Sequence, residues 1–494
     1  MIKETLLIEI GTEELPPRAL TTLSDAFRAG IESELKAKKL SFTDIKAYAT
    51  PRRLALVITD LQSEQEDYTN ERRGPAQQAA MKDGVPTPAL QGFARSCGVE
   101  VDQLQLLETD KGAWYLFKEE VKGDTLEALL PAMIEKALKG LPIPKRMRWA
   151  DHDFEFVRPV RWLVIVYGNK ILDAEIFGIK AGNESRGHRF HTNAPIVITD
   201  AADYENIMTK QGHIIPDFAK RKAMITEQIT AATENVGQPI VNAGLLDEVT
   251  ALVEYPNAMI GSFESHFLDV PQEALIIAME DHQRYFPIVD NNGTLIDKFC
   301  FVSNIISDEP TAVIAGNERV IRPRFADAEF FWNEDKQKPL EHYLTDLENV
   351  VFQTKLGSQA DKINRVKTLA EAIAKEIGAN EALVSRAARL NKADLISDMV
   401  QEFPELQGTM ARYYANFQEE DAIVADSLEQ VYWPRFAGDK LPTTKEAQAL
   451  GLAERLDTIV GIFSIGEIPT GSRDPYGLRR NALAVLRILI EGEL

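Results

Sequence analysis

From residue 358 to the end of the chain, the sequence carries helical patterns only. Ser358 and Asp361 have the spacing of a capping box, apolar residues then recur at helical intervals, and Gly378 is placed to end this first helix. Before residue 335, strand patterns alternate with amphipathic helices. A chain that changes type in this way must form more than one domain. Its length of 494 residues requires the same, since one domain usually holds about 100–200 residues.

The predicted fold class is therefore α+β multidomain, with an N-terminal mixed α/β body followed by an all-helical domain. We expect an N-terminal α+β region over 1–195, a second α/β section over 196–335, and the helical domain over 340–494. In the first region the patterns predict strands at 5–10, 44–49, 54–61, 114–121, 162–167 and 171–179, helices at 17–35, 88–97 and 125–138, and a long loop or mobile insertion over 60–88. In the second they predict helices at 217–236, 244–253 and 271–281, a hairpin over 284–302, and a helix at 316–332 that Pro323 must kink or end.

Two stretches of the helical domain, 391–415 and 451–471, carry aspartates among apolar residues. Each stretch is expected to be helical. Asp394 and Asp398 are four residues apart, so one helix would place both on the same face. Asp457 has a similar apolar setting in the second stretch.

Paired aspartates on a helical module resemble the HD metal-phosphohydrolase fold, which completes its metal site with histidines. Here Ala393 precedes Asp394, and no histidine follows His342. We therefore predict a degenerate, HD-like domain without a catalytic metal. Asp394 and Asp457 are then expected to be structural carboxylates that pair with lysine or arginine or cap neighbouring helices.

The chain is strongly acidic, with a formal net charge of −21. This charge argues against indiscriminate nucleic-acid binding, because phosphate neutralisation supplies most non-specific affinity. The two cysteines, Cys97 and Cys300, are too few for a disulfide framework and indicate a reducing compartment. No apolar run approaches the roughly 20 residues that a membrane span requires. We expect a cytoplasmic protein without a membrane partner, and any contact with RNA must come from local basic patches.

Basic residues do gather locally, most clearly over 145–191, where Lys and Arg outnumber Asp and Glu. Arginine and histidine beside aromatic residues can bind phosphate and stack on unpaired bases, and Gly187 would allow close approach of the backbone. A salt-bridged surface loop is the equally weighted alternative. The candidate RNA-binding residues are Arg186, His188, Arg189 and His191, then Lys145, Arg146 and Arg148, and in the later helix Arg319, Arg322 and Arg324.

The usual nucleotide-binding and nucleophile motifs are missing from the sequence. It contains no GxxxxGK[ST] phosphate loop, no GxGxxG after a strand, no GxSxG elbow and no recognisable adenylate-forming signature. We therefore assign no catalytic residue, no metal ligand and no cofactor to this chain.

Several long motifs carry a family resemblance: LLIEIGTEELPPRAL and TPRRLA near the start, SRGHRF at 185–190, GNERVIRPRFADAEFF at 316–331, and KADLISDMVQEFPELQG and IPTGSRDPYGLRRNAL in the helical part. Together they resemble the beta subunit of the bacterial two-subunit glycyl-tRNA synthetase, from the first strand to the last residue. In that family the alpha subunit holds ATP, Mg and glycine. The resemblance implies a tRNA-binding subunit of glycine–tRNA ligase that is inactive alone, in an alpha2beta2 assembly with tRNA(Gly) as substrate.

The resemblance also implies that section 196–335 is similar to the editing-type domain of phenylalanyl-tRNA synthetase, and that a helical anticodon-binding domain would follow residue 494. Two alternatives remain, an HD-type metal phosphohydrolase and an aminoacyl-tRNA editing hydrolase. The missing histidines disfavour the first. Glycine is the smallest substrate, so steric exclusion rejects its larger competitors without editing, which disfavours the second.

Overall fold

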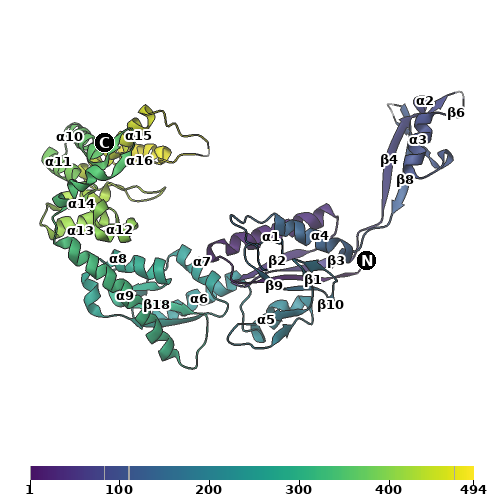
Figure 1. The fold of residues 1–494 in the computed structure, drawn as a ribbon, viewed down its shortest axis with the longest axis horizontal. Coiled ribbons are helices and arrows are strands. Elements are labelled where there is room, and N and C mark those ends of the chain that lie inside the picture. Colours follow the sequence, from purple (N-terminus) through teal and green to yellow (C-terminus); the bar gives the residue numbers. More distant parts are fainter. Residues whose placement is uncertain (1, 83, 110–111, 472) are drawn as a thin grey trace. The chain divides into compact units, whose positions relative to one another are not determined.

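The computed structural model describes residues 2–82, 84–109, 112–471 and 473–494, and it is a mixed α/β, multidomain structure. Its contacts divide the chain into two compact units, both visible in Figure 1. Unit 1 consists of Met1–Ala231, Asn242–Ala258 and Val302–Asp308, and unit 2 of Ala232–Val241, Met259–Phe301 and Glu309–Leu494. The three-domain boundaries expected from the sequence stay a prediction. No helix among the described residues is long and apolar enough to cross a lipid bilayer.

Unit 1 is built on a five-stranded antiparallel sheet in the order β10-β9-β1-β3-β2. Its strands are β1 (Lys3–Thr12), β2 (Asp44–Thr50), β3 (Arg53–Gln62), β9 (Val160–Tyr167) and β10 (Lys170–Ile171). Gly11 of β1 lies opposite both Arg53 and Trp162, so β3 and β9 begin where β1 ends. The strands predicted at 5–10, 44–49, 54–61 and 162–167 are confirmed.

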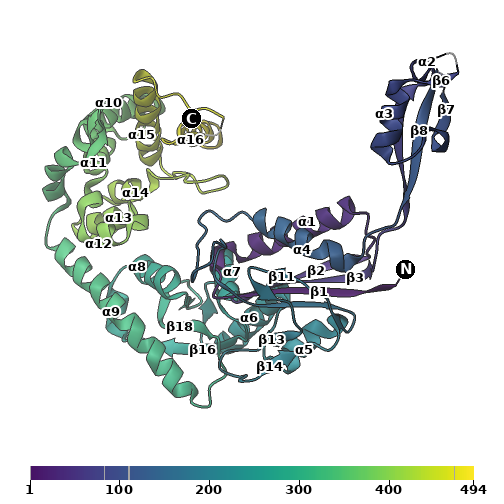
Figure 2. The ribbon, with the colours of Figure 1, turned by 45° about the vertical axis from the view of Figure 1, so that its right-hand side comes forward.

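The two faces of this sheet are covered by different elements (Figures 1 and 2). On one face, α1 (Leu20–Ala37) and α4 (Leu126–Lys139) pack on Leu6, Ile8 and Ile10 of β1. On the other, α5 (Tyr204–Lys210) packs near Leu7, because successive side chains of a strand point to opposite faces. The other elements here are η1 (Pro17–Ala19), β11 (Glu175–Ile176), β12 (Ile179–Lys180), β13 (Glu184–Arg186), β14 (Pro195–Val197), η3 (Ala201–Asp203), α6 (Phe218–Thr233) and α7 (Ala243–Leu252).

The prediction of one strand at 171–179 is wrong, and so is the loop interpretation of 60–88, while the alternative of a mobile insertion stays a prediction. The segment 171–179 is not one strand: β11 and β12 pair through a turn at Phe177 and Gly178, and both turn residues have positive φ. The polar segment 60–88 is not a loop, because β4 (Tyr68–Ala76) pairs along β8 (Gly112–Val121). The exposed, polar residues of β4 lack the alternation that marks a half-buried strand, so their pairing leaves no hydrophobic signal.

The segment between β4 and β8 forms a small module with its own core of Ala80, Leu90, Ala94 and Leu104. Its other elements are α2 (Gln77–Ala80), β5 (Met81–Lys82), β6 (Val85–Pro86), α3 (Pro88–Cys97), η2 (Val101–Gln103) and β7 (Gln105–Thr109). The helix predicted at 88–97 is confirmed and ends at Gly98, which has φ 72°.

A four-stranded sheet in the order β15-β17-β18-β16 comes next in the chain. Its strands are β15 (Gln238–Pro239), β16 (Asn257–Ser262), β17 (Phe286–Val289) and β18 (Leu295–Ser303), accompanied by η4 (Ser265–Asp269), α8 (Gln272–Ile277) and η5 (Ala278–Gln283). The predicted hairpin over 284–302 is confirmed. Pro323 does not end the next helix, since α9 runs through it from Pro310 to Lys336. Ile321, Phe325 and Trp332 are buried on both sides of the proline, and this packing offsets the missing backbone hydrogen bond.

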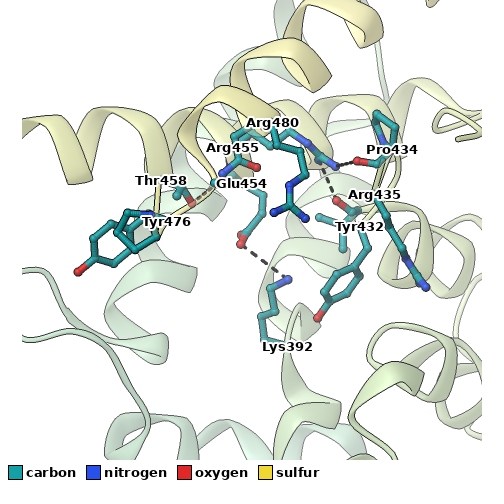
Figure 3. A pocket seen from close by; sticks show the side chains of 13 residues that line it. Lys392, Tyr432, Pro434, Arg435, Glu454, Arg455, Thr458, Tyr476 and Arg480 are labelled. Atoms are coloured by element: carbon teal, nitrogen blue, oxygen red, sulfur yellow. Dashed lines mark hydrogen bonds and ion pairs between the residues drawn. The ribbon is translucent and has the colours of Figure 1, made fainter. Parts of the chain in front are cut away.

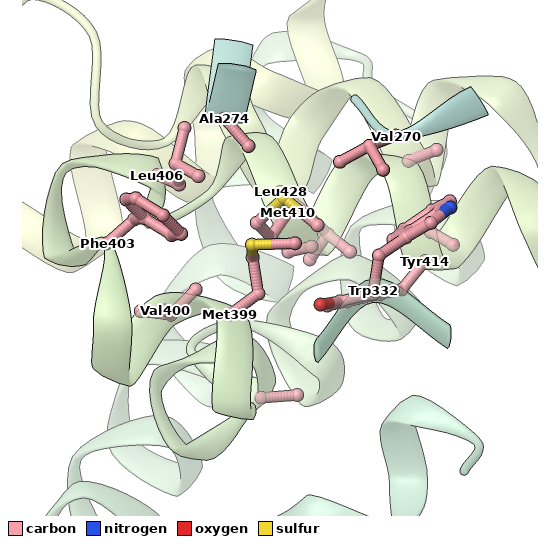
Figure 4. Close-up of a cluster of buried hydrophobic side chains, with 14 of the residues drawn as sticks. Val270, Ala274, Trp332, Met399, Val400, Phe403, Leu406, Met410, Tyr414 and Leu428 are labelled. Atoms are coloured by element: carbon pink, nitrogen blue, oxygen red, sulfur yellow. The ribbon is translucent and has the colours of Figure 1, made fainter. Parts of the chain in front are cut away.

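The rest of unit 2 is mainly helical. Its elements are η6 (Leu340–Leu344), η7 (Asp346–Asn349), the strand pair β19 (Val351–Gln353) and β20 (Gly357–Ser358), α10 (Gln359–Ile377), α11 (Glu381–Leu390), η8 (Ala393–Ile396), α12 (Asp398–Glu402), η9 (Pro404–Leu406), α13 (Thr409–Phe417), α14 (Ala422–Gln430), α15 (Lys445–Ser464) and α16 (Leu478–Glu491). The capping box of Ser358 and Asp361 and the left-handed Gly378 are confirmed. Figure 4 shows the core, where Met399, Phe403 and Met410 pack together.

The prediction of one helix over 391–415 is wrong. The segment folds as η8, α12, η9 and α13, so Asp394 and Asp398 do not share a helical face. Lys392 starts the break with a left-handed backbone, φ 68°, and Ser397 then caps α12 through the backbone N–H of Val400. Local capping thus prevails over the helical pattern of apolar residues.

The predicted structural roles of Asp394 and Asp457 are confirmed. Asp394 is fully buried, and its Oδ2 accepts hydrogen bonds from the backbone N–H groups of Gly408, at 2.6 Å, and Ala411, at 3.2 Å, at the start of α13. Asp457 forms ion pairs with Lys362, at 3.2 Å, and Arg365, at 2.7 Å. Both carboxylates hold helices in place.

Candidate nucleic-acid interface

The carboxyl end of β1 is the place where distant segments of unit 1 meet. Gly11 lies between Arg53 and Trp162 in the sheet, and the side chain of Arg53 reaches Ser185 and Arg186 of β13. The Trp162 ring covers Gly11 so closely that a Cβ at Gly11 would lie 1.9 Å from the ring. Glycine is therefore required here by space.

A buried carboxylate, Glu9, organises this end of the sheet. The side chains of Trp162, Ser185 and Tyr204 all donate hydrogen bonds to it, the last two at 2.5 Å. Arg53, also fully buried, lies 3.4 Å from Glu9. A buried charge is tolerated when it is paired and hydrogen-bonded, and Glu9 meets both conditions.

Arg53 links this network to the segment that follows β13. Its guanidinium lies 3.5 Å from Glu254, donates to the backbone oxygen of Arg186 at 2.7 Å and contacts Ser185 Oγ at 3.1 Å. Burial opposes the charge of Arg53, but Glu9 and Glu254 raise the pKa of its guanidinium above its ordinary value. Arg53 therefore stays charged and fixes the backbone from which Arg186 projects.

Five arginines surround this network, and we call them the arginine cluster: Arg52, Arg158, Arg161, Arg186 and Arg189. Arg52 and Arg186 lie 5.6 and 5.4 Å from the centre of the Trp162 ring, and Arg158 donates to the backbone oxygen of Glu14. Arg161 pairs with Glu13 at 2.6 Å, while Arg189 lies 3.7 Å from Glu13 and 3.6 Å from Glu14.

Positive charge prevails in this cluster, because its five arginines outnumber the three glutamates that act on them, Glu13, Glu14 and Glu254. Within the described parts of the chain, Arg186 is exposed and forms no ion pair. Arginine side chains that lean on an indole and keep their donors free can bind phosphate and stack on bases. The surface thus has the chemistry of an RNA contact inside an acidic chain.

Of the four residues predicted in the 185–191 segment, Arg186 and Arg189 join the cluster and His188 does not. His188 has no exposed surface, and its Nδ1 accepts a hydrogen bond from the backbone N–H of Phe190. Because its side chain is buried, we leave His188 out of the arginine cluster, and its contact with RNA stays a prediction. His191 is half-buried, and its Nε2 accepts from the backbone N–H of Ile306 at 3.2 Å.

The other predicted residues lie in other surroundings. Arg146 donates to the backbone oxygen of Lys139 at the end of α4, and Arg148 pairs with Glu155 at 3.0 Å. Lys145 is exposed nearby in the chain. Arg319, Arg322 and Arg324 are all exposed on α9 in unit 2, with Arg322 paired to Glu264.

The candidate RNA-binding residues predicted from the sequence do not include Arg52, Arg158 and Arg161. Arg52 lies in the TPRRLA motif and Arg161 directly precedes Trp162, so each was visible as a basic residue. Only the pairing of β1 with β3 and β9 shows that they meet the 185–191 segment. Among the described residues, no group of three or more His, Cys, Asp or Glu side chains is placed to hold a metal ion.

Comparison with known proteins identifies the family. A family model described as glycyl-tRNA synthetase beta subunit matches residues 6–494. The chain belongs to this family. A glycine–tRNA ligase beta subunit of Hahella chejuensis is 50% identical over 496 residues, which cover 100% of this chain and 72% of the relative. The corresponding subunits of Marinobacter nauticus and Pseudomonas putida (strain W619) are 48% and 49% identical, each with 100% of this chain and 72% of the relative covered.

Membership of the family makes the chain a subunit of an aminoacyl-tRNA synthetase of the ligase class. Neither hydrolase alternative, the HD phosphohydrolase or the editing hydrolase, is supported by these matches.

Proposed function

We propose that this chain is the tRNA-binding, non-adenylating beta subunit of glycine–tRNA ligase, and that the arginine cluster is one of its tRNA contacts. The observation that carries the proposal is the fixed group of arginines around Trp162, held by the buried pair of Glu9 and Arg53 in a chain of net charge −21. A rigid backbone presents Arg186 at little entropic cost. The acidic remainder of the chain would repel RNA docked elsewhere.

The proposal includes a catalytic alpha partner, because the family and the named relatives are beta subunits. ATP, Mg and glycine would bind in that alpha subunit, in an alpha2beta2 assembly that charges tRNA(Gly) in the cytoplasm. In this assembly the helical part of unit 2 would be a degenerate HD-like domain. Its support is that Asp394 is used as a helix cap and Asp457 as an ion-pair partner.

The test compares tRNA binding by the assembled subunits with and without Arg186→Ala and Arg189→Ala. Each charged hydrogen bond is worth about 1.5–3 kcal/mol, so binding should weaken by roughly that amount for each phosphate that the variant no longer holds. The log–log salt slope should flatten by about 0.7–0.9 for each such phosphate. Stability should change by no more than about 0–1 kcal/mol per residue, because both side chains are exposed.

The matched control is Arg28→Ala with Lys36→Ala, which removes the same charge from α1, where both side chains pair with Glu32. The control should bind tRNA as the parent does. A double variant with an unchanged affinity and salt slope but a lower melting temperature would reject the arginine cluster as a tRNA contact. The next candidates would then be Arg319, Arg322 and Arg324.

A further inference from the structure

Unit 2 contains a second cationic site, which the proposed tRNA contact does not use. A cavity of about 420 Å³ is lined by Lys392, Tyr432, Arg435, Glu454, Tyr476 and Arg480, among others (Figure 3). This volume lies within the usual range of small-molecule sites, about 300–1,000 Å³. The residues come from the break before η8, the segment after α14, helix α15, and the start of α16 with the turn before it.

The carboxylate in this cavity is already neutralised. Glu454 lies 3.4 Å from Lys362 and 3.7 Å from Lys392, and it accepts a hydrogen bond from Asn391. Burial opposes ionisation of Glu454, but Lys392 and Lys362 lower the pKa of its carboxyl group below the ordinary value. Glu454 is therefore ionised and, together with Asp457 beside Lys362, it balances Lys362 and Lys392.

Three arginines line the cavity, and none of them forms an ion pair within the part of the chain that the structure describes. Arg455 is buried, and its guanidinium donates hydrogen bonds to the backbone oxygens of Val431 and Gly451, both at 2.9 Å. Arg435 and Arg480 are exposed, and no hydrogen bond occupies either guanidinium among the described residues. Figure 3 shows Arg480 reaching toward the space between Glu454 and Tyr432.

Two further features indicate that the cavity is built for a ligand. Lys392 adopts a left-handed backbone, φ 68°, which is uncommon for a residue with a side chain, and its ammonium lies 3.6 Å from the centre of the Tyr432 ring. The hydroxyl of Tyr432 is buried and has no hydrogen-bond partner among the described residues. A buried polar atom without a partner is costly, so Tyr432 brings an unmet hydrogen-bonding group to the residues that line the cavity.

We propose that this cavity binds a nucleotide with two or more phosphates, without metal and without turnover. Arg435, Arg480 and Lys392 would hold the phosphates, since guanidinium groups form paired hydrogen bonds with phosphate oxygens. The half-exposed ring of Tyr476 offers a surface on which a base can stack. A lone inorganic ion would fill only a small part of the cavity and would make no stacking contact with this ring.

The test titrates the full chain with ADP, ATP, GTP and inorganic pyrophosphate by isothermal titration calorimetry, in buffer without divalent cations. We expect saturable binding of at least one nucleotide, weakened by salt. Arg435→Ala with Arg480→Ala should weaken it about tenfold or more, as the loss of a charge-assisted hydrogen bond predicts. Arg389→Ala, an exposed arginine of α11 paired with Glu341, is the control and should bind as the parent does.

Tyr476→Ala should weaken the binding of nucleotides but leave the affinity for pyrophosphate unchanged. The proposal is overturned if no nucleotide binds, if the double variant binds as tightly as the parent, or if pyrophosphate binds as tightly as every nucleotide. Hydrogen exchange of the parent chain, with and without nucleotide, measures binding at this cavity without any variant. A saturating nucleotide should slow exchange at 431–435 and 476–481, and unchanged exchange there would also overturn the proposal.

Discussion

Replacing Arg53 with methionine should destabilise unit 1 much more than an ordinary surface substitution does. The change removes the guanidinium that lies 3.4 Å from Glu9 and leaves that carboxylate buried without its cation. Breaking a buried ion pair from one side costs about 3–5 kcal/mol. The backbone oxygen of Arg186 also loses its 2.7 Å hydrogen bond, so the 185–191 segment should become more mobile.

The loss of stability should be smaller when the charge of Glu9 is removed together with that of Arg53. Glu9→Gln combined with Arg53→Met removes the charge stranded at Glu9 and leaves only Glu254 without its contact to Arg53, so the two substitutions together should cost less than the sum of their separate costs. Directly interacting residues commonly show coupling of about 0.5–3 kcal/mol in such a double-mutant cycle. The expected coupling lies toward the upper end of this range, because both side chains are fully buried.

Hydrogen exchange followed by mass spectrometry is the suitable assay, because a chain of two compact units need not unfold in one step. Peptides from β1, β3 and β9 should exchange faster in Arg53→Met and partly recover in the double variant. Peptides from α10 to α16 serve as an internal control and should not change. Fully additive costs, or unchanged exchange in β1, would refute the argument that Glu9 and Arg53 form one unit.

Three further predictions concern other parts of the chain. Asp394→Ala should destabilise α13 by about 1–3 kcal/mol, since it leaves the N–H groups of Gly408 and Ala411 without an acceptor. Hydrogen exchange of residues 408–417 measures this loss. A stoichiometric metal ion that disappears with the substitution would contradict the structural role. Burial and the neighbouring His188 and His213 lower the pKa of His191, so unit 1 should lose stability as pH falls from about 7 through the folded-state pKa, and His191→Gln should remove this part of the pH dependence of melting. The chain without an alpha subunit should show no glycine-dependent pyrophosphate exchange and no ATP hydrolysis, and either activity in the purified chain would contradict this.

The sequence predicts elements well where one face is buried and caps are explicit. The strands of unit 1 alternate between two packed faces, and α10 has both its capping box and its terminal glycine. Prediction fails where pairing replaces burial, as in the exposed strand β4, and where local caps divide an apolar segment, as in 391–415. Pro323 does not end α9, because tertiary packing prevails over the local cost of proline, while the predicted kink stays a prediction.

Only part of the arginine cluster could be predicted from the sequence. Arg186 and Arg189 stand out in a basic segment, but the burial of His188 depends on long-range packing that spacing does not reveal. Arg52 and Arg161 join the cluster only through the register of β1 with its two neighbours. The clustering of residues more than 100 positions apart is a property of topology, and one sequence does not contain it in readable form.

The most direct test of the tRNA-binding role separates amino-acid activation from tRNA charging. The chain, as parent or as the Arg186→Ala, Arg189→Ala variant, is combined with an alpha subunit, and glycine-dependent pyrophosphate exchange and glycyl-tRNA formation are measured side by side. The proposed role predicts unchanged exchange with a reduced kcat/KM for tRNA in the variant, while Arg28→Ala with Lys36→Ala leaves both unchanged. Loss of exchange in parallel with charging, or charging at the parent's kcat/KM, would contradict it.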